Sequence, residues 1–324
     1  MLHRRGVVLS CMGLTGFGVA RPAAAQTWPT RTVTIVVPFA PGGLIDILAR
    51  LLADQLRQTL GQPVVVENRS GAGGIPGART VATAAPDGYT LLLANTNLAI
   101  NPWLYRQLPY DTAMAFAPII LAYTVPNIIV VHPSVPARNL AELIALAKAE
   151  PGRLNYASPT TGTFPHLAMV LLLHQAGVRM THVPYNGLPP ALTALLTGQV
   201  QVMSNDPPGV LPHIASGALR AIAVTSRTRL PSLPDVPTLD EAGLSGFEAV
   251  GWQGVAAPAG TPEAVIRRLH DALAAALAVP EVRARLSSQG VNFVVSSPEE
   301  FRDFFGRELE RWRGAVAAAG AVAD

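Results

Sequence analysis

Short apolar runs alternate with amphipathic segments along the chain. Residues 33–37 form a β-branched apolar run, and residues 46–60 carry apolar side chains at the spacing of a helix. Further apolar runs at 64–66 and 91–93 flank a second helical segment at 78–85. Because strands alternate with helices, this part predicts a mostly parallel sheet of an α/β fold.

The same units recur in the second half of the chain. Strands are expected at 128–131, 155–157, 182–183, 200–203, 219–224 and 252–256. Helices are expected at 139–150, 165–175, 189–197, 262–278 and 298–318. Asn139 and Glu142 form a capping box at the start of the first of these helices. Residues 227–243 are rich in proline and turn formers and are interpreted as a connection.

Two series of α/β units predict two lobes, each a mostly parallel sheet flanked by helices. We expect residues 26–125 together with 240–324 to form the first lobe, and residues 126–239 to form the second. Clefts between domains are favoured sites for small ligands, so a ligand site is expected between the lobes.

The first 25 residues have the order of an export signal. Arg4 and Arg5 precede an uncharged, mostly apolar run of about 15 residues, which is shorter than the roughly 20 that a spanning helix needs. Ala23, Ala24 and Ala25 then match a cleavage site. This segment predicts a signal peptide over residues 1–25 and a periplasmic protein. A short uncleaved anchor is the alternative, and the export route, Sec or Tat, stays open.

Charge and cysteine content exclude several function classes. The chain has 24 basic and 21 acidic residues, and three of the basic residues but none of the acidic ones lie within residues 1–25. The rest of the chain is therefore neutral, which gives no electrostatic basis for binding nucleic acid. The only cysteine, Cys11, lies in the same segment, so neither a disulfide nor a catalytic thiolate is expected in the exported protein.

A glycine-rich loop between the first strand and the first helix is the leading candidate for a ligand site. Its glycines let backbone N–H groups approach a ligand, and the helix start adds a partial positive charge. Such a loop can bind an anion without a basic side chain, while a plain tight turn is the alternative. Asp46 could hold the loop by accepting backbone N–H bonds. The loop residues proposed to bind ligand are Phe39, Ala40, Pro41, Gly42 and Gly43.

Two polar loops follow later strands, at residues 94–97 and 158–163. They lie at the carboxyl ends of strands, where open α/β sheets bind ligands, and together with the first loop they could hold both ends of a dicarboxylate. Ordinary polar loops are the alternative. The candidate residues are Thr96, Asn97, Ser158, Thr160, Thr161, Gly162 and Thr163, with His166 in the helix that follows. Asn205 and Asp206 follow the strand expected at 200–203, and there the carboxylate could accept from a ligand amine or hydroxyl, or cap the next helix.

Signatures of enzymes and cofactor sites are missing from the sequence. Residues 71–77 imitate a dinucleotide fingerprint, but Pro76 replaces its third glycine and no acid follows the next strand. There is no G-x-S-x-G or H-E-x-x-H motif, and His166, His174 and His182 have a spacing that fits no zinc site. We therefore expect no catalytic residues, no cofactor and no metal.

Seven motifs follow one another along the chain. They are VVPFAPGG at 36–43, VENR with GAGG at 66–74, APDGYT at 85–90, AINP at 99–102, LNYAS at 154–158, HVPY at 182–185 and APAGTP at 257–262. In this order they resemble the receptors of tripartite tricarboxylate transporters, also called the Bug family of periplasmic binding proteins. The resemblance runs from about Trp28 to Asp324.

This resemblance implies a type II periplasmic-binding fold that closes around its ligand. It implies that backbone amides of the Pro38–Gly43 loop hold one carboxylate, that the loops at 94–97 and 158–163 surround the rest, and that Tyr185 belongs to the site. The implied ligands are di- or tricarboxylates, acidic amino acids or aromatic carboxylates. The implied partners are the large and small membrane subunits of a transporter, served by a monomeric receptor.

Three positions depart from the family pattern and leave the ligand open. Ile45 stands where the family often has threonine, Asn186 where lysine is common, and Asn205–Asp206 reverses a usual order. Two other functions remain as alternatives to the transport receptor. One is a periplasmic sensor that feeds a membrane kinase, and the other is an organic-acid isomerase or lyase.

Overall fold

The structure is a computed structural model that describes residues 28–319. The expected signal peptide, residues 1–25, lies outside this range. Within the described range, no helix combines the length and the apolar character needed to cross a membrane.

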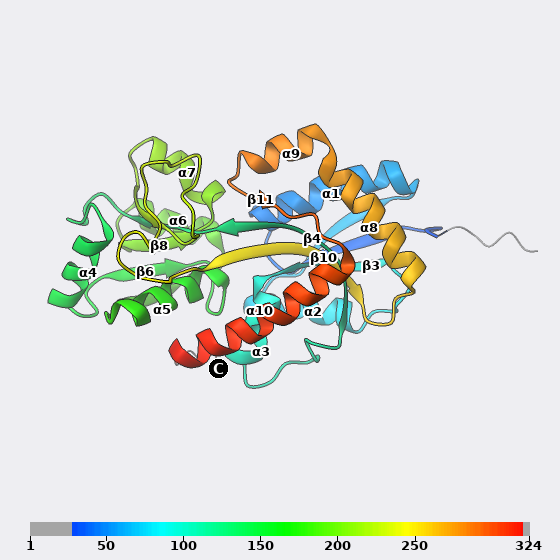
Figure 1. The fold of residues 1–324 in the computed structure, drawn as a ribbon, viewed down its shortest axis with the longest axis horizontal. Coiled ribbons are helices and arrows are strands. Elements are labelled where there is room, and N and C mark those ends of the chain that lie inside the picture. Colours follow the sequence, from blue (N-terminus) through cyan, green and yellow to red (C-terminus); the bar gives the residue numbers. More distant parts are fainter. Residues whose placement is uncertain (1–27, 320–324) are drawn as a thin grey trace, which may run out of the picture.

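The chain forms two sheets that lie side by side (Figure 1). The first has the order β11-β4-β10-β3-β1-β2 and the second the order β7-β6-β8-β5-β9. Strands of the first are β1 Val33–Val37, β2 Val64–Asn68, β3 Thr90–Asn95, β4 Phe116–Pro126, β10 Val250–Pro258 and β11 Asn292–Phe293. Strands of the second are β5 Ile128–Val131, β6 Asn155–Ser158, β7 Thr181–Pro184, β8 Val202–Asn205 and β9 Arg220–Val224.

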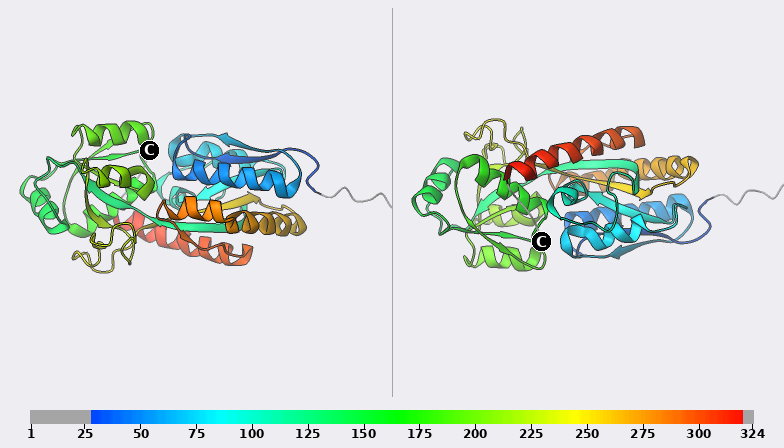
Figure 2. Two further views of the ribbon diagram at one scale, coloured as in Figure 1. Left: turned by 90° about the horizontal axis from the view of Figure 1, so that it is seen from above. Right: turned by 90° about the horizontal axis from the view of Figure 1, so that it is seen from below.

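Helices flank both sheets. Those that accompany the first sheet are α1 Leu44–Leu60, α2 Ile75–Ala82, α3 Thr96–Leu104, α8 Glu263–Ala278, α9 Pro280–Ser287 and α10 Pro298–Ala319, with the short 3₁₀ helix η1 Ala72–Gly74. Those of the second are α4 Leu140–Ala149, α5 Phe164–Ala176, α6 Leu188–Leu196 and α7 Pro207–Ala215. The two views of Figure 2 show the resulting pair of lobes.

Helix α10 ties the two lobes together on one side. It packs on β4 and α3 of the first lobe and reaches α5 of the second, where the rings of Trp312 and Phe164 meet edge to face with centroids 6.0 Å apart. One apolar core therefore runs continuously through both lobes on this side. Two further cores lie separately, one between α1, α8 and the first sheet, and one in the second lobe.

Both sheets are mixed, which corrects the expectation of mostly parallel sheets. In the first, β1 pairs in parallel with β2 and β3, while β10 and β11 pair antiparallel. In the second, β6 pairs in parallel with β7 and β8, while β5 pairs antiparallel with β8 and β9. The reason is connectivity: β4 leads the chain into the second lobe through Asn127, and β10 brings it back, so these two long strands run in opposite directions.

Most predicted elements are confirmed, and a few elements of the structure were not predicted. The strand at 33–37 has the predicted bounds. At the predicted capping box the Glu142 N–H donates to Asn139 Oδ1 at 2.9 Å, while Glu142 Oε2 accepts the Arg138 N–H in place of that of Asn139. The predictions missed β4, β11, α3 and α9, and residues 94–97 are not a loop, because α3 begins at Thr96. Each missed element except β11 contains proline or begins with it, or begins with polar residues that resemble a loop.

Candidate ligand-binding cavity

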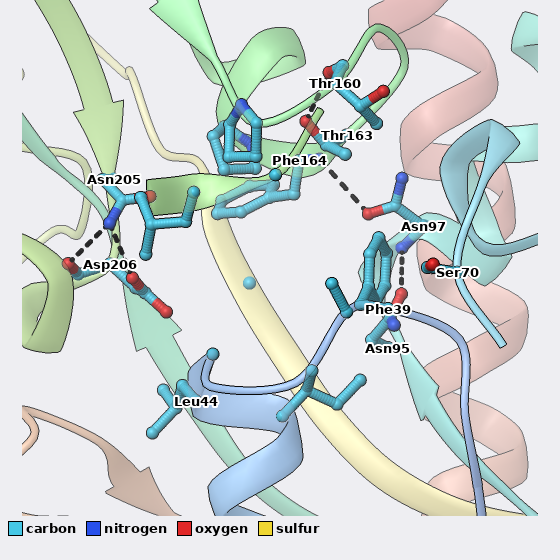
Figure 3. Close-up of a pocket in the computed structure, with 18 of the residues that line it drawn as sticks. Phe39, Leu44, Ser70, Asn95, Asn97, Thr160, Thr163, Phe164, Asn205 and Asp206 are labelled. Atoms are coloured by element: carbon cyan, nitrogen blue, oxygen red, sulfur yellow. Dashed lines mark hydrogen bonds between the residues drawn. The ribbon is translucent and has the colours of Figure 1, made fainter. Parts of the chain in front are cut away.

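A cavity of about 490 Å³ lies between the lobes, where strands end and helices begin (Figure 3). Five helices, α1, α3, α5, α6 and α7, start at residues that line it: Gly43, Asn95, Thr163, Gly187 and Asp206. The two long crossing strands close its base through Val125 and residues 251–253. A pocket at the carboxyl ends of strands, enclosed by two lobes, is where this class of fold holds small ligands.

The loop before α1 presents unpaired N–H groups to this cavity. Gly42 adopts a φ of 95°, a conformation that side chains rarely allow, and this turns the chain into the helix. The N–H groups of Gly43, Leu44 and Ile45 have no acceptor among the described residues. No proline occupies the first turn of α1 to remove a donor. The result is a helix start able to bind an anion.

Asp46 holds this loop in place, as the sequence predicted. Its Oδ2 accepts the Gly42 N–H at 3.0 Å and Arg50 Nε at 2.9 Å, and its Oδ1 accepts Asn68 Nδ2 at 2.9 Å. Asn68 also donates to the Phe39 carbonyl at 3.0 Å. Burial acts to raise the pKa of Asp46, but these hydrogen bonds and Arg50 outweigh it and keep the pKa below its ordinary value. Asp46 does not line the cavity, so it supports the loop from behind.

The second lobe contributes three helix starts of a different character. Helices α5, α6 and α7 each have proline in the first two positions, which removes N–H donors that α1 retains. The Gly187 N–H donates to the Pro159 carbonyl at 2.7 Å, and the Phe164 N–H to Asn97 Oδ1 at 3.2 Å. Few backbone donors on this side therefore remain for a ligand.

Several polar side chains predicted to contact ligand are used within the protein. Thr96 Oγ1 accepts the Trp252 N–H at 2.8 Å, and Asn97 Nδ2 donates to the Gly162 carbonyl at 2.7 Å. Asn97 thus bridges the lobes with both ends of its amide. Thr163 Oγ1 donates to the Thr160 carbonyl at 2.9 Å. These groups shape the cavity wall, and its open polar groups lie elsewhere.

A stacked histidine pair lies behind the 158–163 loop and does not line the cavity. The His166 and His182 rings are 4.0 Å apart, and the His166 Nδ1 accepts the Gly162 N–H at 3.2 Å. Ser158 Oγ is hydrogen-bonded to His182 Nε2 at 2.7 Å. Burial lowers the pKa of His166 to about 3, helped by His182, and burial lowers that of His182 to about 4. Both rings are neutral at neutral pH and support the loop.

Asp206 is the one ionisable side chain among the described residues that line the cavity. It occupies the N-cap position of α7 but makes no capping hydrogen bond, which corrects the capping role considered for it. Its Oδ1 accepts Asn205 Nδ2 at 2.9 Å. Burial raises the pKa of Asp206 to about 6. Figure 3 shows this pair on the opposite side of the cavity from Asn97 and Phe39.

The structure brings together most of the predicted residues but not all. Phe39, Ala40, Pro41, Gly42, Gly43, Thr96, Asn97, Thr160, Thr163, Asn205 and Asp206 line the cavity. Asp46, Ser158, Thr161, Gly162, His166 and Tyr185 do not line it. The Tyr185 hydroxyl is buried and has no hydrogen-bond partner within the described chain.

Other lining residues were missed. Among them are Ser70, Gly71 and Gly73 after β2, Asn186, Gly187 and Leu188 around the start of α6, Asn127 between β4 and β5, and Gln253 in β10. The position of a loop after a strand was the available signal for residues 70–73 and 186–188. No group of three or more acidic, histidine or cysteine side chains in residues 28–319 is arranged to hold a metal ion.

Comparison with known proteins places this architecture in a family. The tripartite tricarboxylate transporter family receptor model matches residues 48–320. Protein BugT of Bordetella pertussis is 39% identical over 306 residues, which are 94% of this chain and 94% of BugT.

Two solved structures are similar over nearly the whole described chain. R. palustris Rpa4515 with adipate has a TM-score of 0.86 and 37% identity, and the match covers 91% of this chain and 100% of that one. MatC from Rhodopseudomonas palustris with bound malate has a TM-score of 0.82 and 36% identity, with 89% and 100% covered. The two-lobed binding-protein fold is therefore confirmed, and the chain belongs to the tripartite tricarboxylate transporter receptor family.

Proposed function

We propose that this protein is a solute receptor that captures an organic carboxylate in the cavity between its lobes. The observation that carries the proposal is the start of α1, where the N–H groups of Gly43, Leu44 and Ile45 face a cavity without basic side chains. A carboxylate there gains several hydrogen bonds and the favourable end of the helix dipole. Relatives of the same family contain adipate and malate in their structures.

The lobes would close on the ligand by bending where the chain passes between the sheets. One passage is Asn127, and the other is the segment that leads from β9 to β10. On this basis the described residues 28–125 and 240–319 would belong to the first lobe and residues 126–239 to the second, in keeping with the bounds expected from the sequence. The continuous core along α10 and α5 lies on one side of the cleft, so opening would occur on the other.

In the cell, the receptor would act in the periplasm after removal of residues 1–25. It would deliver its ligand to the large and small membrane subunits of a tripartite transporter. It would perform no chemistry on the ligand, in keeping with the solute-binding role of its family.

Thermal unfolding tests the proposal. The chain from residue 26 onward is unfolded and refolded to remove any ligand that was carried through purification. It is then melted with mono-, di-, tri- and aromatic carboxylates. We expect one class to raise the Tm by several degrees, because a ligand that binds only the folded state stabilises it in proportion to the logarithm of its concentration. Absence of a shift with every carboxylate would refute the proposed function.

A further inference from the structure

The cavity has opposite electrostatic characters at two places. The start of α1 carries the positive end of a helix dipole and unpaired N–H groups, whereas Asp206 carries a carboxylate. Every other described lining residue is uncharged, so no lysine, arginine or histidine accompanies either place. A ligand that fits both places must be negatively charged at one end and positively charged at the other.

Asp206 has room for such a contact. It makes no ion pair with the described residues, and its one side-chain hydrogen bond to them comes from Asn205. The nearby Tyr123 hydroxyl is neutral, because burial raises its pKa well above the ordinary value, and it donates to Gln253 rather than to Asp206. With its own pKa at about 6, Asp206 is ionised above neutral pH. Asp206 is half-buried at the cavity wall. A carboxylate partly removed from water without a cation is costly, and a cationic ligand group would compensate for it.

We propose that the preferred ligand is an amino carboxylate, whose carboxylate binds the start of α1 and whose ammonium binds Asp206. This inference rests on the proposed carboxylate-receptor function and narrows its substrate class. A dicarboxylate of the same length would bring its second charge toward the Asp206 carboxylate, with no basic lining residue to offset the repulsion. The volume of about 490 Å³ leaves room for a chain or ring between the two charged groups.

Matched ligand pairs test this assignment. Each pair keeps one carboxylate and the chain length and changes only the other end: succinate and 4-aminobutyrate, adipate and 6-aminohexanoate, terephthalate and 4-(aminomethyl)benzoate. Affinities are measured by titration calorimetry above neutral pH, with Asp206 ionised. In at least one pair we expect the amino ligand to bind about ten-fold more tightly or better, because a charged pair shielded from water discriminates strongly.

The Asp206→Asn variant separates the role of the charge from that of the cavity shape. We expect it to weaken binding of the preferred amino ligand by about ten-fold or more and to leave or improve binding of the matching dicarboxylate. Asp303→Asn, on the exposed face of α10, removes the same charge outside the cavity and should change neither affinity.

The outcomes distinguish the two proposals. Tighter binding of the dicarboxylate in every pair, or equal loss of both ligands in Asp206→Asn, would overturn the amino-carboxylate assignment and leave the carboxylate receptor standing. Failure of all six ligands and of the wider carboxylate panel would overturn both. The ratios measured on the unmodified protein remain decisive even if the variant does not fold.

Discussion

The two sides of the cavity use the same strand–loop–helix unit to opposite effect. On the first lobe, α1 begins without proline and keeps the N–H groups of Leu44 and Ile45 unpaired. On the second lobe, α5, α6 and α7 each have proline within their first two residues, and Asp206 stands at the start of α7. A helix start attracts anions only while its donors are free. The difference shows that two similar lobes can present unlike groups to one cavity, free backbone donors from the first and a carboxylate from the second.

The largest expected effect comes from closing the anion site of the first lobe. Gly43 has φ −83° and ψ 170°, and a Cβ there would meet no atom within 4 Å, so Gly43→Trp should fold. The indole would occupy the space before the free N–H groups. We expect carboxylate affinity to fall by about 100-fold or more, equivalent to roughly 3 kcal/mol, with the Tm of the free protein little changed.

Gly314→Trp is the matched control for this prediction. Gly314 is exposed on α10, its Cβ position is equally open, and it does not line the cavity. Calorimetry should find its affinity unchanged. If Gly43→Trp binds as well as the control, the start of α1 is not the anion site and the contrast between the two sides disappears.

The second prediction concerns the support of the same loop. Asp46→Asn keeps the shape of the side chain but replaces an acceptor oxygen with an NH₂ group that faces the Gly42 N–H or Arg50. Arg50 is half exposed, so the ion pair contributes little, and the main loss is the buried hydrogen bonding. We expect about 1–3 kcal/mol less unfolding free energy and a carboxylate affinity reduced by roughly ten-fold.

Asp54→Asn, two helical turns along α1, is its control. Asp54 is 70% exposed, and its carboxylate is 3.9 Å from Arg57. Denaturant titration should find its unfolding free energy within about 0.5 kcal/mol of the unmodified protein. An equal effect of both variants would mean that Asp46 acts only through its charge and does not position the loop.

The same contrast explains how far the sequence predicted the site. The first side was predictable, because a buried strand, two glycines and a helix-start acid lie within a few residues of one another in the chain, from Val33 to Asp46. The second side depends on which loops the two sheets bring together, and local pattern does not encode this. Asn127 and Gln253 line the cavity through the crossing strands β4 and β10, and β4 itself was missed.

Polar side chains were the least predictable part of the site. Thr96 and Asn97 were chosen because hydroxyl and amide groups follow a strand, and they do line the cavity. However, a polar side chain can hydrogen-bond a ligand only where its donors and acceptors are not already paired with protein groups. The Trp252 N–H is hydrogen-bonded to Thr96, and backbone groups of residues 162–164 are hydrogen-bonded to Asn97. These partners lie more than sixty positions away in the sequence, so the local pattern does not reveal them.

The third prediction concerns three groups of the second lobe, His166, His182 and Asp206, whose shifted pKa values link stability to pH between about 4 and 6.5. His166 and His182, with pKa values of about 3 and 4, take up protons more readily when unfolded, so their contribution to stability falls as the pH drops below about 6.5. The pKa of Asp206 is raised to about 6, so its effect is opposite: its contribution to the free energy of unfolding falls as the pH rises through this range. Each group contributes up to about 1.4 kcal/mol per pH unit.

Two variants resolve these opposing contributions. Unfolding free energy is measured by denaturant titration from pH 4 to pH 6.5. Acidification should lower the unfolding free energy of the unmodified protein, because two histidines outweigh the one acid whose pKa is raised. The lowered pKa values of Asp46 and Glu241 add to this loss at the acid end of the range. His166→Gln should flatten this slope, and Asp206→Asn should steepen it. The same slope in all three proteins would show that these groups titrate alike in the folded and unfolded states.

The smallest expected effect comes from making the second side resemble an anion site. Asn186 lines the cavity, is exposed, and stands where the family pattern often has lysine. Asn186→Lys would offer the second carboxylate of succinate a cation, but an exposed pair is worth only about 0–1 kcal/mol. We therefore expect succinate affinity to rise by about five-fold at most, and the gain to vanish in about 0.5 M salt, where screening is strong.

Asn186→Gln supplies a longer uncharged side chain, and an equal gain there would assign the effect to contact rather than charge. A salt-sensitive gain confined to lysine would instead assign the effect to the added cation, which offsets the repulsion between a second ligand carboxylate and Asp206.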